Sequence, residues 1–234
     1  MVEALIFDVF GTVVDWRNGV AREASVLFQE RGIDIDPHEF ADAWRAEYDP
    51  SMARIRDGNR GYIALDVLHR ENLDRVLSRF GLEDRFDDDA RAAFNHAWEK
   101  LPPWPDSVPG LTRLKARYII APCSNGSIAL MTRLAKYGGL NWDAIVGAEI
   151  ARDYKPQPVV YQASVAALGL TPDRVMMVAA HNGDLAAARD AGLKTAFFPR
   201  PTEHGEGQTK DLTAERDWDI VATDMEDLAG KMAA

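Results

Sequence analysis

Six short apolar runs, with helical patterns between most of them, constrain the fold of this chain more than any other feature. The runs cover residues 4–7, 118–122, 144–146, 175–179, 195–198 and 220–222. Short strands that alternate with helices are typical of a parallel sheet covered by helices on both faces. We therefore predict an α/β fold built on a doubly wound parallel sheet.

The long interval between the first two runs breaks this alternation. Its pattern is helical: Phe40, Ala43, Trp44 and Tyr48 share one helix face, and further helices are expected over 61–80 and 88–100. The proline-rich stretch 101–105 suits a return hinge. We predict a helical cap domain, residues 16–104, inserted into a Rossmann-like core domain of residues 1–15 and 105–234.

Composition limits where the protein works. The 47% hydrophobic and 27% charged residues match a soluble globular protein, and no run is long enough to cross a bilayer. The chain opens on a strand-like segment instead of a signal core, so we expect a cytoplasmic protein without a membrane partner. A single cysteine, Cys123, excludes an internal disulfide and a cysteine-based zinc site.

The charge of the chain restricts its ligands. A formal net charge of −10 argues against nucleic-acid binding, because a phosphate backbone would be repelled. A small anionic substrate would also be repelled at long range. A site for such a substrate must carry its own cations, and Arg45 and Lys155 are the candidates.

Asp8 ends the first apolar run and has Phe10 two residues after it. Gly11 then lets the chain turn, so the carboxylate is expected at the carboxyl edge of the sheet, where α/β proteins build sites. Phosphoryl transfer needs a cation and an acid for the leaving alkoxide, whereas displacement of halide needs neither. Phe10 therefore favours metal-free attack on carbon. In the alternative interpretation, Asp8 is only a cap or turn residue.

Polar residues also follow the second apolar run. Ser124 and Asn125 precede Gly126 and a helix, where a hydroxyl and backbone N–H groups can hold an anionic group. The same residues can instead simply cap the helix.

Lys155 precedes Pro156, which favours an extended backbone that would let the ammonium reach across the strand ends. A lysine beside Asp8 would lower the pKa of that carboxyl. The alternative is a solvated surface lysine. Tyr161 can share the same pocket or belong to the core.

The fourth run leads into His181, Asn182 and Asp184. Asp184 either caps the following helix or orients a water that hydrolyses an ester. His181 is a candidate to protonate a leaving group or accept a proton, with a packing histidine as the alternative.

These four motifs, in this order and with an insertion after the first, resemble the haloacid dehalogenase (HAD) superfamily, type II (S)-2-haloacid dehalogenase subfamily. The resemblance spans essentially the whole chain and implies Asp8 as the nucleophile, Lys155 as the motif lysine and Asp184 as the acid that orients water. The remaining matches are Thr12 as the motif threonine, Ser124 and Asn125 as contacts of the substrate carboxylate and halide, Tyr161 as the tyrosine after the lysine, and Arg45 as the halide receiver. Val9 and Phe10 are also expected to contact substrate.

The chain departs from the subfamily in its fourth motif, which usually carries serine and asparagine where this sequence reads Ala179 to Asn182. Either His181 stands near the asparagine position or Asn182 takes it after a register shift. The extra imidazole motivates the hypothesis that His181 assists the departure of fluoride.

The resemblance implies a hydrolase that converts short (S)-2-haloacids, with fluoroacetate as a further candidate, into (R)-2-hydroxyacids. Asp8 would attack C2 opposite the halogen, and water would hydrolyse the ester. No metal or organic cofactor is expected, and a homodimer would fit the subfamily. Two alternatives are a magnesium-dependent HAD phosphatase and a non-catalytic HAD-fold binding protein.

Overall fold

A single six-stranded parallel sheet forms the centre of the molecule. The computed structural model describes all residues, 1–234. The strands lie in the order β3-β2-β1-β4-β5-β6, which confirms the predicted doubly wound α/β fold. Their bounds are β1 Ala4–Phe7, β2 Ile119–Ser124, β3 Val146–Gly147, β4 Val175–Ala179, β5 Lys194–Phe197 and β6 Ile220–Val221.

Strand β1 marks the point at which the winding of the sheet reverses. It pairs in parallel with β2 on one side and with β4 on the other. The connections that leave β1 and β2 therefore diverge from those that leave β4 and β5, which opens a crevice at the carboxyl edge. Asp8 follows β1 directly and donates its backbone N–H to the carbonyl of Val178 at 3.0 Å. The nucleophile candidate thus stands on the backbone of the central strand pair.

The two faces of the sheet bury alternate residues of β1. Leu5 and Phe7 belong to the larger hydrophobic cluster, whereas Ala4 and Ile6 belong to a smaller one. Truncation of a fully buried residue such as Phe7 to alanine costs about 3–5 kcal/mol. Helices α6 Ser107–Lys115, α7 Ile128–Gly138 and α11 Met225–Lys231 contribute to the larger cluster, and α9 Pro158–Ala167 and α10 Asn182–Asp190 to the smaller.

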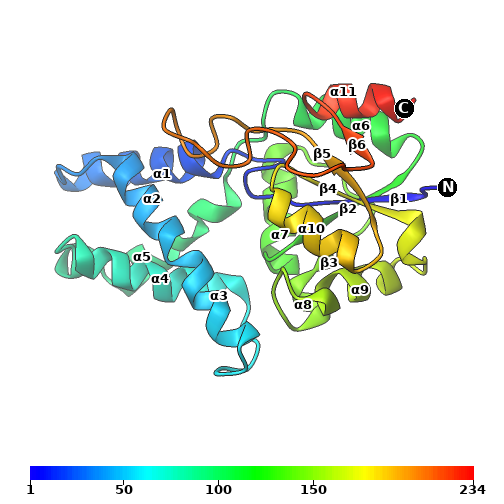
Figure 1. Cartoon of the computed structure of the whole chain (residues 1–234). Coiled ribbons are helices and arrows are strands. Elements are labelled where there is room, and N and C mark those ends of the chain that lie inside the picture. Colours follow the sequence, from blue (N-terminus) through cyan, green and yellow to red (C-terminus); the bar gives the residue numbers. More distant parts are fainter.

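The helices that follow β1 and precede β2 in the sequence form a layer beside the sheet (Figure 1). We call residues 16–99 the helical layer. It consists of α1 Trp16–Arg31, α2 Pro37–Ala46, α3 Tyr48–Arg56, α4 Leu65–Arg79, η1 Glu83–Arg85, α5 Asp88–Asn95 and η2 His96–Glu99. Asp15 caps α1 by accepting the N–H of Asn18 at 3.1 Å, and Asp36 caps α2. The domain boundaries at 15/16 and 104/105 stay a prediction.

The interior of the helical layer is aromatic. The ring centroids of Phe28 and Phe40 lie 5.1 Å apart, and Trp44 lies 5.2 Å from Phe94. Both predicted helices in this region are shorter than expected: one begins at Leu65, and the other changes to a 3-10 helix at His96.

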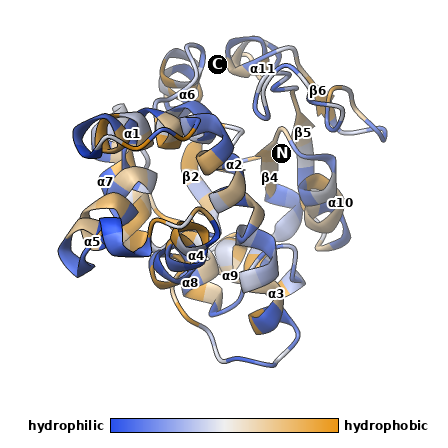
Figure 2. Ribbon diagram, turned by 90° about the vertical axis from the view of Figure 1, so that its left-hand side faces the viewer, coloured by the Kyte–Doolittle hydropathy of each residue, from blue (hydrophilic) through white to orange (hydrophobic).

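Hydropathy follows this layout. In Figure 2, strand β2 shows hydrophobic colours, whereas the outer helices α5 and α10 carry both colours. No helix is both long and apolar enough to span a membrane. The short connecting helices are α8 Ala148–Ala151 and η3 Pro172–Arg174.

The Gly, Thr, Glu and His residues of segment 199–211 predict a surface loop, but the segment contains two buried ionisable residues. Arg200 donates Nε–H to the carbonyl of Thr12 at 2.9 Å and forms a two-pronged ion pair with Asp106. Glu203 is only 1% exposed. The expectation was wrong for these two residues because their partners come from the turn after β1 and from the segments beside it. Local composition does not reveal such partners.

Candidate active site

A cavity of about 280 Å³ opens where the carboxyl edge of the sheet meets the helical layer. Its walls combine residues from both regions, as a site for a small substrate requires. Seven residues expected from sequence line it: Asp8, Phe10, Arg45, Asn125, Lys155, His181 and Asp184. Tyr48, from the start of α3, also lines it and was not expected.

The Asp8 carboxylate is almost fully enclosed by donors. Lys155 Nζ lies 2.8 Å from Oδ1, while Oδ2 accepts the Thr12 hydroxyl at 2.7 Å and faces His181 Nδ1 at 3.1 Å. Burial alone would raise the pKa of Asp8, but the charges of Lys155 and His181 hold it well below its ordinary value. Asp8 is therefore ionised. Its carboxylate accepts no backbone N–H, which removes the interpretation of Asp8 as a cap or turn residue.

Lys155 bridges two carboxylates. Its ammonium contacts Asp8 at 2.8 Å and Asp184 Oδ2 at 2.5 Å, and the residue is only 7% exposed. Burial opposes its charge, but Asp184 and Asp8 together raise the pKa of Lys155 above its ordinary value. The backbone is fixed as well, because the Lys155 N–H donates to Asn125 Oδ1 at 2.8 Å. The alternative of a solvated surface lysine is excluded.

Asp184 lies in the first turn of α10, and two donors from elsewhere in the chain hold its carboxylate. Besides Lys155, the Tyr161 hydroxyl donates to Oδ1 at 2.5 Å. Burial and the nearby negative charge of Asp184 raise the pKa of Tyr161, so the phenol keeps its proton. The carboxylate therefore does not cap α10. Tyr161 does not line the cavity but supports the residue that does.

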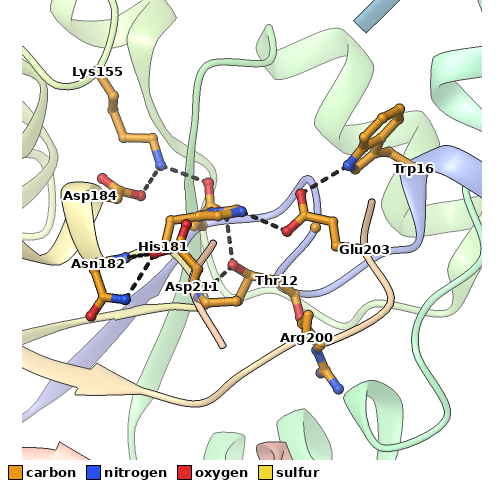
Figure 3. Close-up of polar contacts among 12 residues, drawn as sticks. Thr12, Trp16, Lys155, His181, Asn182, Asp184, Arg200, Glu203 and Asp211 are labelled. Carbon is orange, nitrogen blue, oxygen red and sulfur yellow. Dashed lines mark hydrogen bonds and ion pairs between the residues drawn. The ribbon is translucent and has the colours of Figure 1, made fainter. Parts of the chain in front are cut away.

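His181 stands between the carboxylates of Asp8 and Glu203, and Figure 3 shows its contact with Glu203. Its Nδ1 faces Asp8, and its Nε2 lies 2.8 Å from Glu203 Oε2. The other Glu203 oxygen accepts the Trp16 indole N–H at 2.9 Å. Burial would lower the pKa of His181, but the charge of Glu203 and the hydrogen bond to Asp8 raise it well above 6.5. Sequence reasoning missed Glu203.

Gly11 leaves the space that the Glu203 carboxylate fills. Its φ of +89° favours glycine, and a Cβ there would lie 2.1 Å from Glu203 Oε1. The turn after the nucleophile is therefore shaped around the buried carboxylate. A glycine at this position was expected only to let the chain turn.

The wall toward the helical layer is aromatic and carries one cation. Phe10 packs edge-on against Tyr48 and Trp98, with centroid distances of 6.3 and 5.7 Å. The Arg45 guanidinium lies 3.9 Å from the Tyr48 ring centroid, and its buried Nη1 has no hydrogen-bond partner. This wall thus offers an apolar surface and free N–H donors.

Besides Tyr161, three further predicted contact residues lie outside the cavity. The Asn182 side chain contacts Asp211, the Thr213 carbonyl and the Trp218 indole, because the first residue of α10 points toward the loop between β5 and β6. The Ser124 hydroxyl accepts the Gly126 N–H at 3.0 Å and is 1% exposed. The Val9 side chain is fully buried in the core. Helix α7 is capped by Ser127, not by Ser124 or Asn125.

The chain is similar to proteins of a known family. A family model described as haloacid dehalogenase-like hydrolase matches residues 2–192. An (S)-2-haloacid dehalogenase of Xanthobacter autotrophicus is 30% identical over 203 residues, which cover 86% of this chain and 76% of the relative. The solved structure of a defluorinating L-2-haloacid dehalogenase is 50% identical with a TM-score of 0.98, and the match covers 100% of this chain and 96% of that one.

A further similar structure contains a covalently bound molecule. It is the Xanthobacter autotrophicus L-2-haloacid dehalogenase with chloropropionic acid covalently bound. This chain is 25% identical to it, with a TM-score of 0.82 and coverage of 100% of this chain and 99% of that one.

Proposed function

This chain belongs to the haloacid dehalogenase-like hydrolases, type II (S)-2-haloacid dehalogenase subfamily, and we propose that it hydrolyses short (S)-2-haloacids to (R)-2-hydroxyacids through an ester on Asp8. One observation carries the proposal: a buried, ionised Asp8 carboxylate faces the cavity, and the residue two positions after it is Phe10 instead of an acid. Lys155 supplies the positive charge beside that carboxylate.

The two Asp8 oxygens suit different tasks. Oδ1 accepts one hydrogen bond, from Lys155, whereas Oδ2 is engaged by Thr12 and His181. Oδ1 therefore retains more electron density for attack on C2. Displacement from the side opposite the halogen inverts that carbon and releases halide toward the helical layer.

Backbone amides provide the binding site for the substrate carboxylate. Phe10 and Asn125 line the cavity, and their N–H groups donate no hydrogen bond within the chain. Two such donors can hold one carboxylate and orient C2 above Asp8. Because these two backbone amides are uncharged, they leave the Asp8 carboxylate ionised.

The departing halide is received by Arg45 and Asn125. Arg45 Nη1 is buried and has no partner in the chain. The side-chain oxygen of Asn125, Oδ1, accepts the Lys155 N–H, and the side-chain nitrogen, Nδ2, is left free to donate. Both donors stabilise negative charge only as the carbon–halogen bond breaks, which is when catalysis needs them.

Water then hydrolyses the ester at its carbonyl carbon, Asp8 Cγ. Asp184 orients this water and takes its proton. Lys155, which contacts both carboxylates, protonates the departing alkoxide and regains a proton from Asp184. The bond between Cγ and Oδ1 breaks, so the hydroxyacid keeps the inverted configuration and Asp8 keeps the oxygen of the water. The second proton of the water is released when Asp8 ionises.

Halide release from both enantiomers of 2-chloropropionate, with and without a chelator, tests this function. We expect release from the (S) form alone, unchanged by the chelator. A requirement for magnesium, or hydrolysis of phosphomonoesters, would instead support the phosphatase alternative. No release from either enantiomer would favour a binding protein.

Fluoroacetate is proposed as a further substrate on the basis of the defluorinating relative that shares 50% identity. Fluoride release from fluoroacetate, measured with an ion-selective electrode, checks this. We also propose a cytoplasmic homodimer, which sedimentation of the purified chain would test.

A further inference from the structure

The two oxygens of the Asp8 carboxylate have unequal surroundings, and this matters after the ester has formed. If Oδ1 carries the alkyl group, Oδ2 becomes the ester carbonyl oxygen. Thr12 Oγ1 and His181 Nδ1 already lie 2.7 and 3.1 Å from Oδ2. Attack by water on Cγ places negative charge on this oxygen.

Both ring nitrogens of His181 face oxygens that can only accept. Nδ1 faces Asp8, and Nε2 faces Glu203 at 2.8 Å. An ionised carboxylate has no proton to donate, so each contact is a hydrogen bond only if the imidazole nitrogen carries the proton. The geometry thus requires an imidazolium.

The surroundings of Glu203 hold its carboxylate against the His181 imidazolium. It is 1% exposed, and its second oxygen accepts the Trp16 indole N–H at 2.9 Å (Figure 3). Gly11 leaves the space that Glu203 fills. A buried carboxylate is costly unless it is paired, and His181 is the cation that pairs with it. Once Asp8 is esterified and uncharged, Glu203 is the carboxylate that still contacts the imidazolium.

We propose that Thr12 and His181 form an oxyanion hole for hydrolysis of the Asp8 ester, and that Glu203 is a positioning residue that keeps His181 protonated in that step. This inference rests on the proposed function. The electron pair of the Cγ–Oδ2 π bond moves onto Oδ2 when water adds, and it returns when the Cγ–Oδ1 bond breaks. No proton moves to or from His181.

This assignment places His181 on the nucleophile side of the reacting carbon. A halogen displaced by attack from Asp8 leaves on the opposite side, toward Arg45. The hypothesis that His181 assists the departure of fluoride therefore conflicts with the position of its imidazole. An alternative role, as the base that deprotonates water, requires the neutral imidazole.

The groups that surround His181 determine how its charge depends on pH. Asp8 and Glu203 contact it directly, Lys155 and Asp184 lie beyond Asp8, and Arg45 faces Glu203 from the helical layer. His204 lies beside Glu203, with Nε2 at 3.6 Å from Oε1. Removal of the Glu203 charge should therefore make His181 lose its proton at a lower pH.

The test follows the ester itself. Enzyme is mixed with (S)-2-chloropropionate and quenched on the millisecond scale, and intact-protein mass spectrometry counts the adduct as it forms and decays at pH 6 to 10. Wild type should hydrolyse the ester at a constant rate around neutral pH and more slowly at alkaline pH. In Glu203→Gln this decline should begin at least one pH unit lower, with the rate of ester formation changed less than threefold.

Two further variants and a control complete the design. His181→Gln should slow ester hydrolysis by about 10²–10³-fold at every pH, the usual loss of an oxyanion-hole donor. Glu206→Gln, an exposed acid of the same loop, should behave like wild type. If Glu203→Gln does not fold, the ¹⁵N resonances of His181 in the wild-type enzyme decide, because they must show a doubly protonated ring at pH 8.

Two results would overturn the inference: ester hydrolysis that accelerates as His181 loses its proton, or an unchanged pH profile in Glu203→Gln. A singly protonated His181 ring at pH 8 would do the same. If no adduct forms in any variant, the proposed function itself fails, and the oxyanion hole fails with it.

Discussion

Two histidines near the cavity, His181 on the sheet side and His69 in the helical layer, have pKa values shifted in opposite directions. His181 contacts two carboxylates, and its pKa is raised well above 6.5. His69, in α4 of the helical layer, stacks on Trp98 at 4.2 Å, and neither of its ring nitrogens has a partner. Burial and the positive charge of Arg45 lower its pKa well below 6.5. Burial alone neutralises an imidazole, and only paired carboxylates reverse that effect.

The two walls of the cavity differ in whether their charged groups are paired. On the sheet side, Asp8, Lys155 and Asp184 satisfy one another at 2.5–2.8 Å. On the helical side, Arg45 keeps an unpartnered nitrogen beside aromatic rings. The first wall is organised before substrate arrives, whereas the second leaves donors free for the halide. The following changes test this division.

Lys155→Met should have the largest effect among these substitutions. Methionine keeps the length of the side chain and removes the charge, so Asp8 and Asp184 become two close carboxylates without their shared cation. The pKa of Asp8 should rise, and ester formation should slow by about 10³-fold. The burst of halide release, measured between pH 5 and 8, checks this prediction. Lys136→Met, on an exposed face of α7, should leave the burst unchanged.

His181→Ala should slow ester hydrolysis by about 10²–10³-fold, by the same factor for fluoroacetate and chloroacetate. Both substrates give the same glycolyl ester, and the halide has already left. Single-turnover decay of the adduct measures this factor. A larger loss of ester formation with fluoroacetate would restore a leaving-group role for the imidazole.

Arg45→Gln should act on the other half-reaction. Without the guanidinium, the developing halide loses charged N–H donors, and ester formation should slow by about 10²-fold while hydrolysis changes little. Rapid-quench measurement of both rates separates the two effects. Arg54→Gln, at an exposed position of α3, serves as the control. Equal losses in both steps would contradict the separation of the two walls.

His69→Phe should have the smallest effect on turnover, within about threefold, and should stabilise the fold by about 1–2 kcal/mol because an unpartnered buried imidazole is removed. Its lowered pKa means that the unfolded chain takes up a proton that the folded chain does not. Wild type should therefore lose stability relative to the variant as pH falls below 6.5, by about 1.4 kcal/mol per pH unit.

The stability linked to His181 should have the opposite sign. Its raised pKa contributes stability that is fully present below 6.5 and is lost as pH rises through the folded-state value. Urea unfolding of wild type, His69→Phe and His181→Gln between pH 5 and 9 compares the two histidines. Parallel curves for the two variants would break the comparison.

The sequence was sufficient for the fold and for most of the sheet side of the site. Strands 4–7 and 175–179 were predicted to the residue, since fully buried parallel strands read as continuous apolar runs. Asp8 and Lys155 were predicted as site residues from their positions near the ends of apolar runs and from the resemblance of their motifs. Their contact at 2.8 Å agrees with that expectation.

The remaining residues had no local signal. Glu203 lies in a loop whose composition suggested only exposure, and its partners are distant in sequence. His69 and Tyr48 appeared as ordinary positions of helices. Asn182 was expected at the site because it can take the motif's asparagine position after a register shift. Consecutive residues at a helix start point in different directions, however, and the Asn182 amide holds the loop at 211–218.

The most direct test of the central claim is the position of the solvent oxygen after turnover. Enzyme in excess over (S)-2-chloropropionate is allowed one turnover in H₂¹⁸O, and peptides that contain Asp8 are examined by tandem mass spectrometry. Nucleophilic attack by Asp8 on carbon predicts ¹⁸O in the Asp8 carboxylate and an unlabelled hydroxyl in the lactate. Label in the lactate alone, with none in Asp8, would show that water attacks C2 directly and would contradict the account.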